Sequence, residues 1–354
     1  MSALTIQDLQ IDHKSVPLKH PFVTALHRVD RIEAVRVKII LSNGIVGVGT
    51  GTPNEKVTGD NLTAASAVVE QGIQPVLIGA DFNQWHQLLA TLHASIMNNT
   101  PAKAAIELAL YDARRQLFHC SLPELLGGKN GSVTTDYTIS IGQQEQMVAE
   151  AKDLVKRGFT SLKVKLGKAA IEENIAVIEA IAQATGPDIH LRLDMNQAWT
   201  TRTTMQAAQA WQAAGVKIDF IEQPLPADDL AGMAYLTAHC PYPIMADESV
   251  HSYLDAQKVI SMQAADYINI KLMKTGGLSE AQKINDLAAS RGIHTMLGCM
   301  IEPIESIAAA CSFVLANPNV KFADLDSIFM AELDPDLAKF AKCQGNQIQL
   351  IDHD

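Results

Sequence analysis

The sequence of 354 residues lacks the features of secreted, disulfide-bonded and membrane-spanning proteins. Its five cysteines are odd in number, widely scattered and form no CxxC pair, so we expect neither a disulfide framework nor a zinc ribbon. No apolar run is long enough to span a bilayer, and the first residues show no signal-peptide pattern. These absences predict a soluble, cytoplasmic protein.

Positive charge is also scarce. Lysine and arginine together number 28 against 39 aspartates and glutamates, which gives a formal net charge of −11. Proteins that bind nucleic acid or anionic membranes usually present a basic patch, so we expect neither partner. Hydrophobic residues make up 47% of the chain, which predicts a core large enough for one barrel-type domain and a smaller one.

The first third of the chain predicts an α+β module over residues 1–125. Residues 32–51 alternate apolar and polar side chains around Asn43-Gly44, which is a strong hairpin signal. Thr100-Pro101 then supplies a helix N-cap and a proline at the first helical position. The helical patterns cover Leu62–Leu77, Trp85–Met97 and Ala102–Leu117.

From about Thr134 onward, short apolar strands alternate with amphipathic helices. Polar or functional residues stand at the expected strand ends, 24 to 31 residues apart by subtraction: Thr138, Lys163, Asp194, Glu222, Asp247, Lys271, Met300 and Asp324. Eight strands with seven intervening helices predict an α/β fold, a (β/α)7β modified TIM barrel, over residues 126–328. The N-terminal module would cap this barrel, and residues 329–354 would return to the capping domain.

Three acids stand at three consecutive strand ends: Asp194 in LRLDMNQAW, Glu222 in DFIEQPL and Asp247 in PIMADES. Neighbouring barrel strands lie about 4.8 Å apart, so the three carboxylates can converge on one point. Three hard oxygen ligands suit Mg²⁺, whereas the absence of histidine and cysteine argues against zinc. The alternative is that each acid merely caps the helix that follows it.

Lys163 and Lys165 lie two residues apart in the strand SLKVKLG, so both side chains face the same space. Lys271, in DYINIKLMKTGG, ends a strand on the other side of the acids. A nearby second ammonium would lower the pKa of a lysine and leave a neutral, basic fraction near pH 7. The alternative for Lys163 and Lys165 is a solvated pair, and Lys274, in the glycine-rich loop, is expected to be exposed.

Two bases that face each other across a metal ion suit one reaction in particular. A carbon acid beside a carboxylate is very weakly acidic, and its enolate needs concentrated positive charge. One lysine would remove the α-proton and the opposite lysine would return a proton to the other face. The pattern therefore predicts racemisation or epimerisation.

The K-x-K, D…E…D and later K pattern resembles the enolase superfamily, specifically its muconate-lactonizing subgroup, over essentially the whole chain. Within that subgroup the chain is most similar to the dipeptide epimerases, of which L-Ala-D/L-Glu epimerase is the best known. The pair Asp324 and Asp326 in FADLDS carries this finer resemblance, because a D-x-D pair binds the dipeptide's α-ammonium in that family. The segments TDYTISIG, MADES, INIKLMKTGG and LGCMIE are similar too.

The resemblance implies a role for each site residue, Mg²⁺ as cofactor, a small-molecule dipeptide as substrate and a homo-oligomeric assembly. Lys165 and Lys271 would be the acid/base pair, and Lys163 would support the substrate carboxylate. The implied metal ligands are Asp194, Glu222 and Asp247, with Asn196 and Glu248 beside them. The implied substrate-binding residues are Asp324, Asp326, Thr138, Cys299, Ile301 and His27, of which Thr138 has ordinary strand packing as its alternative.

The mobile-loop residues leave the preferred dipeptide open. In the Ala-Glu enzymes an arginine of the first loop takes the glutamate side chain, whereas here His27 stands in that place and Arg28 is shifted by one. Glu55 in the second loop could attract a cationic side chain or stay solvated. Glu302 is expected to be structural, and Asp228 and Asp229 read as helix-start charges.

Other functions stay open at this point. Within the superfamily they are o-succinylbenzoate synthesis, cycloisomerisation and N-acyl amino acid racemisation, whose substrates carry no free ammonium for the aspartate pair. A Schiff-base aldolase would not need three convergent acids. A barrel kept only for binding would be expected to have lost a lysine or a metal ligand.

Overall fold

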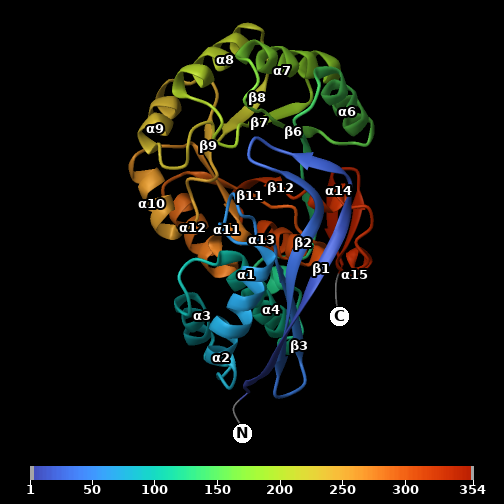
Figure 1. Cartoon of the computed structure of the whole chain (residues 1–354), viewed down its shortest axis with the longest axis vertical. Coiled ribbons are helices and arrows are strands. Elements are labelled where there is room, and N and C mark those ends of the chain that lie inside the picture. Colours follow the sequence, from blue (N-terminus) through green and yellow to red (C-terminus); the bar gives the residue numbers. More distant parts are fainter. Residues whose placement is uncertain (1–3, 352–354) are drawn as a thin grey trace.

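A computed structural model describes residues 4–351 and divides them between an antiparallel capping sheet and a parallel barrel (Figure 1). In the cap, β1 (Ile6–Val23), β2 (Arg28–Leu41) and β3 (Val46–Gly51) form a three-stranded sheet in that order. The predicted hairpin is confirmed, since β2 and β3 pair antiparallel on either side of Asn43 and Gly44. The cap helices are α1 (Leu62–Ala67), the π-helical turn η1 (Val68–Ile73), α2 (Gln74–Leu77), α3 (Trp85–Ala94) and α4 (Thr100–Leu117).

Strand β3 packs directly against the backbone of α4. A Cβ atom built on Gly47 would lie 2.1 Å from the carbonyl oxygen of Ala109, and one on Gly49 would lie 2.2 Å from that of Ala105. Only glycine permits so close an approach, and the VGVGTG sequence of β3 is the local reason for it. The predicted cap at Thr100 is wrong by one residue, because Asn99 takes the N-cap place in a left-handed conformation at φ 51°.

The second part is a nearly closed eight-stranded parallel barrel, as predicted. Its strands are β5 (Tyr137–Ile139), β6 (Ser161–Lys165), β7 (His190–Asp194), β8 (Ile218–Glu222), β9 (Ile244–Ala246), β10 (Tyr267–Lys271), β11 (His294–Gly298) and β12 (Val320–Asp324). Between β12 and β5 the amide of Asp136 donates to the carbonyl of Ala323 at 3.3 Å. Met300 does not end its strand as expected, since β11 stops at Gly298 and the Met300 amide is held by the Glu302 carboxylate at 2.7 Å.

The helices between these strands surround the barrel (Figure 1). They are α6 (Gln144–Lys156), α7 (Ile171–Thr185), α8 (Thr201–Ala213), α9 (Leu230–His239), α10 (Tyr253–Ser261), α11 (Leu272–Thr275), α12 (Leu278–Ser290) and α13 (Ile304–Ala316). One large apolar cluster joins the outward-facing residues of the strands to these helices. Asp229 starts α9 as expected, because its carboxylate accepts from the Gly232 amide at 2.8 Å.

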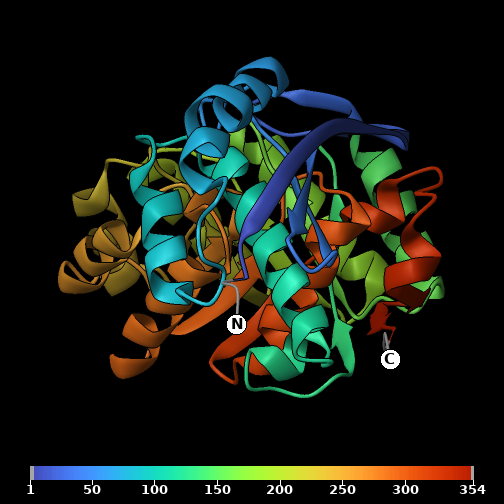
Figure 2. The ribbon, with the colours of Figure 1, turned by 90° about the horizontal axis from the view of Figure 1, so that it is seen from below.

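The remaining elements contact both parts of the chain. They are α5 (Leu122–Leu125), β4 (Ser132–Thr134), α14 (Ser327–Met330), α15 (Leu337–Phe340), β13 (Ala341–Gln344) and β14 (Gln347–Leu350). The β13–β14 hairpin pairs with β4, and Leu18 of β1 bridges to Ala331. Helix α4 also packs against α11 of the barrel, and strand β3 packs against α13. Figure 2 shows the molecule from below.

The tip of the β1–β2 hairpin reaches over the mouth of the barrel (Figure 1). The Val23 amide donates to the Ser140 hydroxyl at 3.2 Å, and the Ile141 amide donates to the Val23 carbonyl at 3.2 Å. These bonds connect the cap to the loop that follows β5. Among residues 4–351 we find no helix with the length and apolar character that crossing a bilayer requires.

Candidate active site

The three predicted metal ligands meet at the carboxyl ends of neighbouring strands. Asp194 ends β7, Glu222 ends β8 opposite it in register, and Asp247 follows β9. Each offers a carboxylate oxygen, and the three oxygens lie within 4.8 Å of one another. All three side chains are buried, with exposures of 0%, 0% and 1%. A cluster of hard anionic oxygens of this size fits a Mg²⁺ ion.

In each of these carboxylates, one oxygen accepts a hydrogen bond from a supporting residue, and the other oxygen lies beside the ammonium of a lysine. One oxygen of Asp194 accepts from the Asn196 amide at 2.9 Å, and one of Glu222 accepts from the Asn269 side chain at 2.7 Å. One oxygen of Asp247 accepts from Lys274 at 2.6 Å. Since one oxygen of each acid is held by the protein, the other is aimed at the shared cavity.

Lys274 is a correction to the sequence analysis, which expected it to be exposed. It is completely buried, and its ammonium donates to the backbone carbonyl and the carboxylate of Asp247 and to the Asn269 carbonyl. The helical turn α11 begins directly after β10 and returns residue 274 beneath the strand ends. Burial lowers the pKa of Lys274, although Asp247 acts in the opposite direction.

Three further lysines face the acids. Lys165 Nζ lies 2.5 Å from Asp194, and Lys271 Nζ lies 2.8 Å from Asp247. Lys163 Nζ lies deeper, at 3.0 Å from Asp194, 2.8 Å from Glu222 and 2.7 Å from Asp324. Because β7, β8 and β9 separate β6 from β10 in an eight-stranded barrel, Lys165 and Lys271 stand on opposite sides of its mouth.

The expected lowering of lysine pKa by a second ammonium is wrong for Lys163 and Lys271. Burial acts to lower both values, but the carboxylates around each ammonium outweigh it and raise the pKa. For Lys163 these are Asp324, Glu222 and Asp194, and for Lys271 the largest contribution is Asp247. The two lysines of SLKVKLG do face one cavity, but acids from four other strand ends surround them.

The same proximity sets the charge of the three acids. Burial acts to raise the pKa of Asp194, but Lys165 and Lys163 lower it to about 2, and Lys271 and Lys274 likewise hold Asp247 well below its usual value. Burial and the charge of Asp194 raise the pKa of Glu222 to about 8. Three acids this close repel one another, and a bound divalent cation would relieve that repulsion.

The two residues expected beside the metal ligands are also in place. Asn196 donates to Glu248 at 3.2 Å, and within residues 4–351 the remaining side-chain oxygens of both residues are buried without a hydrogen-bond partner. Burial and the nearby charge of Asp247 raise the pKa of Glu248 to about 7. Unsatisfied buried oxygens beside an acidic trio are consistent with a site that takes a hydrated cation.

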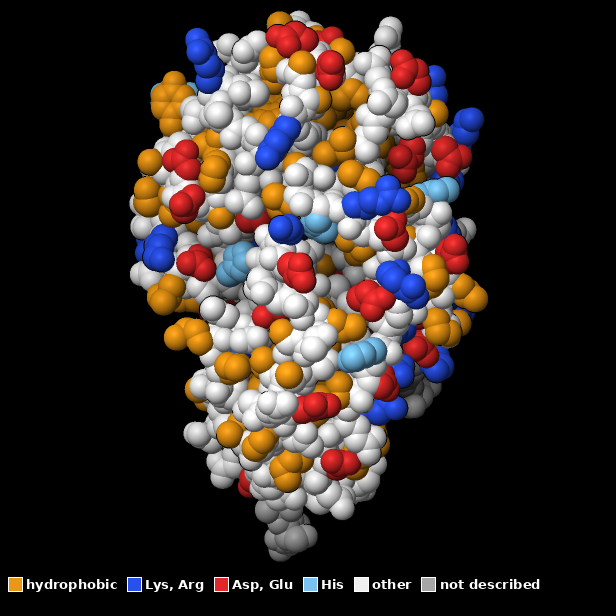
Figure 3. All heavy atoms as spheres, in the orientation of Figure 1, with side chains coloured by type: hydrophobic (Ala, Val, Ile, Leu, Met, Phe, Trp, Pro, Cys, Tyr) orange, Lys and Arg blue, Asp and Glu red, His pale blue; other side chains and the backbone are white. Residues whose placement is uncertain are grey.

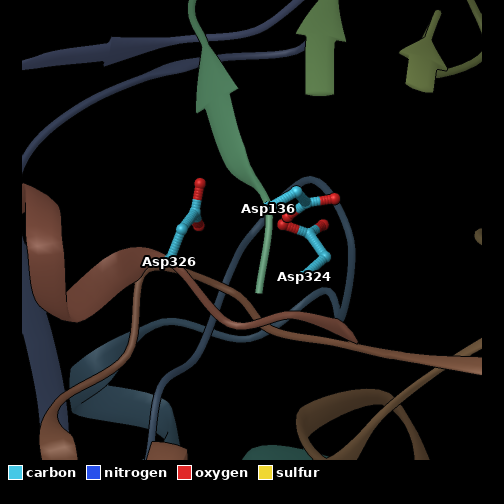
Figure 4. Close-up of side chains that lie close together, drawn as sticks. All are labelled: Asp136, Asp324 and Asp326. Carbon is cyan, nitrogen blue, oxygen red and sulfur yellow. The ribbon is translucent and has the colours of Figure 1, made fainter. Parts of the chain in front are cut away.

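The predicted aspartate pair belongs to a group of three acids (Figure 4). Asp324 ends β12, Asp326 follows it, and Asp136 precedes β5; oxygens of the three lie within 4.8 Å of one another. The Thr138 backbone amide donates to Asp326 at 2.5 Å, and Arg192 donates to Asp136 at 2.7 Å. Burial and the charge of Asp324 raise the pKa of Asp326 to about 7 and that of Asp136 well above its usual value.

Sequence reasoning did not assign Asp136. The residue lies within the TDYTISIG segment, but it precedes its strand, whereas the analysis looked for acids that follow strands. One of its carboxylate oxygens is buried without a partner among the described residues. Thr138 supports this group through its backbone amide and its side chain, which both hydrogen-bond to Asp326.

A cleft lies between the barrel mouth, where the two acid groups are, and the cap. Its lower wall includes Lys165, Lys271, Asn196, Glu248, Thr138, Asp324 and Asp326. The loop after β11 contributes Cys299, Met300 and Ile301, and burial raises the Cys299 pKa so that its thiol stays protonated. Glu302 is structural as expected, since it is buried and holds the Met300 amide.

The cap closes the upper side of this cleft with the hairpin tip and the loop after β3, including His27, Pro53, Asn54 and Val57. Arg28 and Glu55 are exposed and do not line the cleft. The face of the molecule drawn in Figure 3 carries acidic and basic side chains interspersed, without a large patch of one sign. Ten of the predicted site residues thus line one cleft. The other four are buried beside it: Lys163, Asp194 and Asp247 contact its lysines or Asp324, and Glu222 contacts Lys163.

Two family models match the chain. The mandelate racemase / muconate lactonizing enzyme N-terminal domain matches residues 6–127, and the enolase C-terminal domain-like model matches residues 146–348. The chain belongs to this family. The family resemblance inferred from the lysine and acid pattern is therefore confirmed, together with the fold it implied.

Several members of the mandelate racemase / muconate lactonizing enzyme family are similar over nearly the full chain. L-Ala-D/L-Glu epimerase of Bacillus subtilis is 39% identical over 90% of this chain and 87% of its own. Its substrate-liganded structure superposes with a TM-score of 0.95 at 37% identity, covering 98% of this chain and 96% of the other.

A second solved structure is the dipeptide epimerase of Enterococcus faecalis complexed with Mg and L-Leu-L-Tyr. It has a TM-score of 0.90 at 34% identity, with 99% and 97% of the two chains covered. Relatives of this family are named epimerases and racemases, and the present chain is an isomerase of the same kind.

Proposed function

We propose that the protein is a Mg²⁺-dependent dipeptide epimerase that inverts the α-carbon of the dipeptide's second residue. The observation that carries the proposal is the placement of Lys165 and Lys271 on opposite sides of one cleft, each beside an acid of the trio. Amines on both faces of one carbon permit a proton to leave on one side and another to arrive on the other.

The metal ligands would be Asp194, Glu222 and Asp247, whose second carboxylate oxygens lie beside the lysine ammonium groups. When bound there, Mg²⁺ supplies positive charge beside the substrate carboxylate, where negative charge develops as the α-proton leaves. Lys163 adds a fixed ammonium beneath the same region. The carboxylates that raise the pKa of Lys163 and Lys271 interact with them less strongly once a cation shares their charge.

The second acid group suits the other end of a dipeptide. A free α-ammonium carries three N–H donors, and Asp324 and Asp326 present carboxylates on the same side of the cleft. Substrates of the alternative superfamily reactions carry no ammonium and would add no positive charge to a group of three acids whose ion pairs are with Lys163 and Arg192. The acid pair therefore favours dipeptides over N-acylated amino acids and cyclic acids.

The proposal predicts metal-dependent exchange of one proton. In D₂O with Mg²⁺, an L,L-dipeptide should incorporate a single deuterium at the α-carbon of its second residue and yield the L,D epimer. Removal of divalent ions with EDTA should abolish both signals, and added Mg²⁺ should restore them. Mass spectrometry counts the deuterium and NMR locates it; exchange at the first residue, or exchange that survives EDTA, contradicts the proposal.

A further inference from the structure

This inference rests on the proposed function, because that function determines where the side chain of the dipeptide's second residue must point. When the α-proton leaves, the carboxylate, the peptide nitrogen and the side chain lie in one plane, with Lys165 and Lys271 on its two faces. The carboxylate points to the acid trio and the peptide nitrogen to the side of Asp324. The side chain takes the third direction, toward the cap.

The cap presents apolar side chains on that side together with the uncharged polar residues Thr24, Thr52 and Asn54, the imidazole of His27 and the Arg31–Glu33 pair. Phe22, Leu26 and Val29 come from the hairpin, and Pro53 and Val57 come from the loop after β3. The Phe22 ring centroid lies 6.0 Å from Lys165 Nζ, which places this ring directly beside the reacting centre.

His27 is the titratable imidazole of this wall, and its hydrogen bond with Asn54 keeps it neutral. The Asn54 side-chain oxygen accepts from the Lys56 and Val57 amides at 2.9 and 3.2 Å, so its NH₂ group faces His27. That NH₂ group lies 3.1 Å from His27 Nε2, which must therefore be the unprotonated, accepting nitrogen. Burial and the charges of Lys165 and Lys271 lower the His27 pKa in the same sense.

The charged residues of the cap are already paired or point away. Arg31, at the edge of the cleft, lies 2.8 Å from Glu33, and both side chains are about half exposed to solvent. Arg28 lies 3.0 Å from Asp30, is 61% exposed and does not line the cleft. A charged substrate side chain would lose water here without gaining a partner of opposite charge.

We propose that this wall, with His27 held neutral by Asn54, selects dipeptides whose second residue is uncharged and of medium to large apolar size. His27 is then a specificity-determining residue, because a neutral ring in the wall of the cleft gives an acidic side chain no positive charge to pair with. The same wall excludes a lysine or arginine side chain, because Glu33 is already paired with Arg31 and Glu55 does not line the cleft.

The experiment compares kcat/KM for near-isosteric substrate pairs, L-Ala-L-Gln against L-Ala-L-Glu and L-Ala-L-Met against L-Ala-L-Lys, by deuterium exchange in D₂O. We expect the uncharged member to be favoured about 100-fold in each pair, the scale of discrimination from an unmatched polar group. In His27→Arg the Gln/Glu ratio should fall at least about tenfold, whereas His27→Gln and the exposed control Arg28→Ala should keep it.

A wild-type enzyme that uses L-Ala-L-Glu as well as L-Ala-L-Gln overturns this inference while leaving the proposed function intact. An unchanged ratio in His27→Arg also overturns the role given to His27. If none of the four dipeptides exchanges its α-proton, the proposed function itself fails and the inference falls with it.

Discussion

At the scale of single residues, each acid of the trio has one carboxylate oxygen that accepts a hydrogen bond from a residue that is not an acid. Asn196, Asn269 and Lys274 each hold one carboxylate oxygen, so the second oxygen is presented in a defined direction. Groups that orient metal ligands in this way typically change metal affinity by 10–100-fold when they are altered. Lys274 makes three hydrogen bonds, one to the Asp247 carboxylate and two to backbone carbonyls, and is buried more completely than Lys165 or Lys271.

We therefore predict that Lys274→Met lowers the affinity for Mg²⁺ by roughly 10–100-fold. Methionine keeps much of the buried volume but leaves the Asp247 carboxylate without its support. Titration of epimerisation with Mg²⁺ measures the effect, and Lys258→Met serves as control because that side chain is 66% exposed. A Lys274→Met enzyme with wild-type Mg²⁺ dependence would show that the lysine only fills space.

The residues indexed at strand ends converge in the structure, and their catalytic roles stay predictions. Lys163, Asp194, Glu222 and Lys271 were indexed in this way, and Lys165 was found from its two-residue spacing to Lys163. Lys274 was misplaced, because its contacts depend on a helical turn that the Thr-Gly-Gly sequence hid. The lysine pKa directions were missed, because they depend on which acids from distant strands come within 3 Å.

At the scale of elements, a buried ion cluster joins the capping sheet to the barrel. Lys14 of β1 lies 2.8 Å from Glu305 at the start of α13, 2.7 Å from Asp334 and 3.0 Å from Asp336. Asp334 in turn accepts from the Ile304 amide at 3.1 Å. This cluster fixes the base of the long hairpin whose tip covers the cleft, and alternation in the sequence predicted the hairpin but not this long-range anchor.

Removing Lys14 should destabilise the protein strongly. Lys14→Met leaves buried carboxylates without their cation, which typically costs about 3–5 kcal/mol in the free energy of unfolding. Urea denaturation measures the loss. Lys38→Met on the neighbouring strand, whose side chain is 40% exposed, should change stability by less than about 1 kcal/mol.

The Lys14 contribution should also depend on pH in a defined direction. Burial acts to lower the Lys14 pKa, but Glu305 and Asp334 outweigh it and raise the value above 10.5. A lysine whose pKa is raised on folding stabilises fully below its unfolded pKa and loses that contribution as pH rises through the folded value. The stability gap between wild type and Lys14→Met should be constant at neutral pH and shrink above pH 10.5, so a gap that grows there contradicts the assignment.

At the scale of the whole molecule, we propose that the barrel supplies the catalytic groups and the cap supplies the selecting wall. Sequence periodicity predicted the barrel, since a polar residue interrupts an apolar run at nearly every strand end. It could not predict how Asn54 and His27 meet, because the contact joins two loops, 27 residues apart in sequence, that follow no period. The acid Asp136 lies at the seam where the first and last strands approach, which no local pattern reveals.

The central claim is that Lys165 and Lys271 serve opposite faces of one carbon, and the stereochemistry of exchange in single-lysine variants tests it most directly. Each of Lys165→Ala and Lys271→Ala should lose epimerisation, while the lysine that is left exchanges the α-proton of one epimer only. The exposed control Lys168→Ala should behave as wild type. Our account predicts that the two variants exchange opposite epimers in D₂O; exchange of the same epimer by both, or normal epimerisation by either, would contradict it.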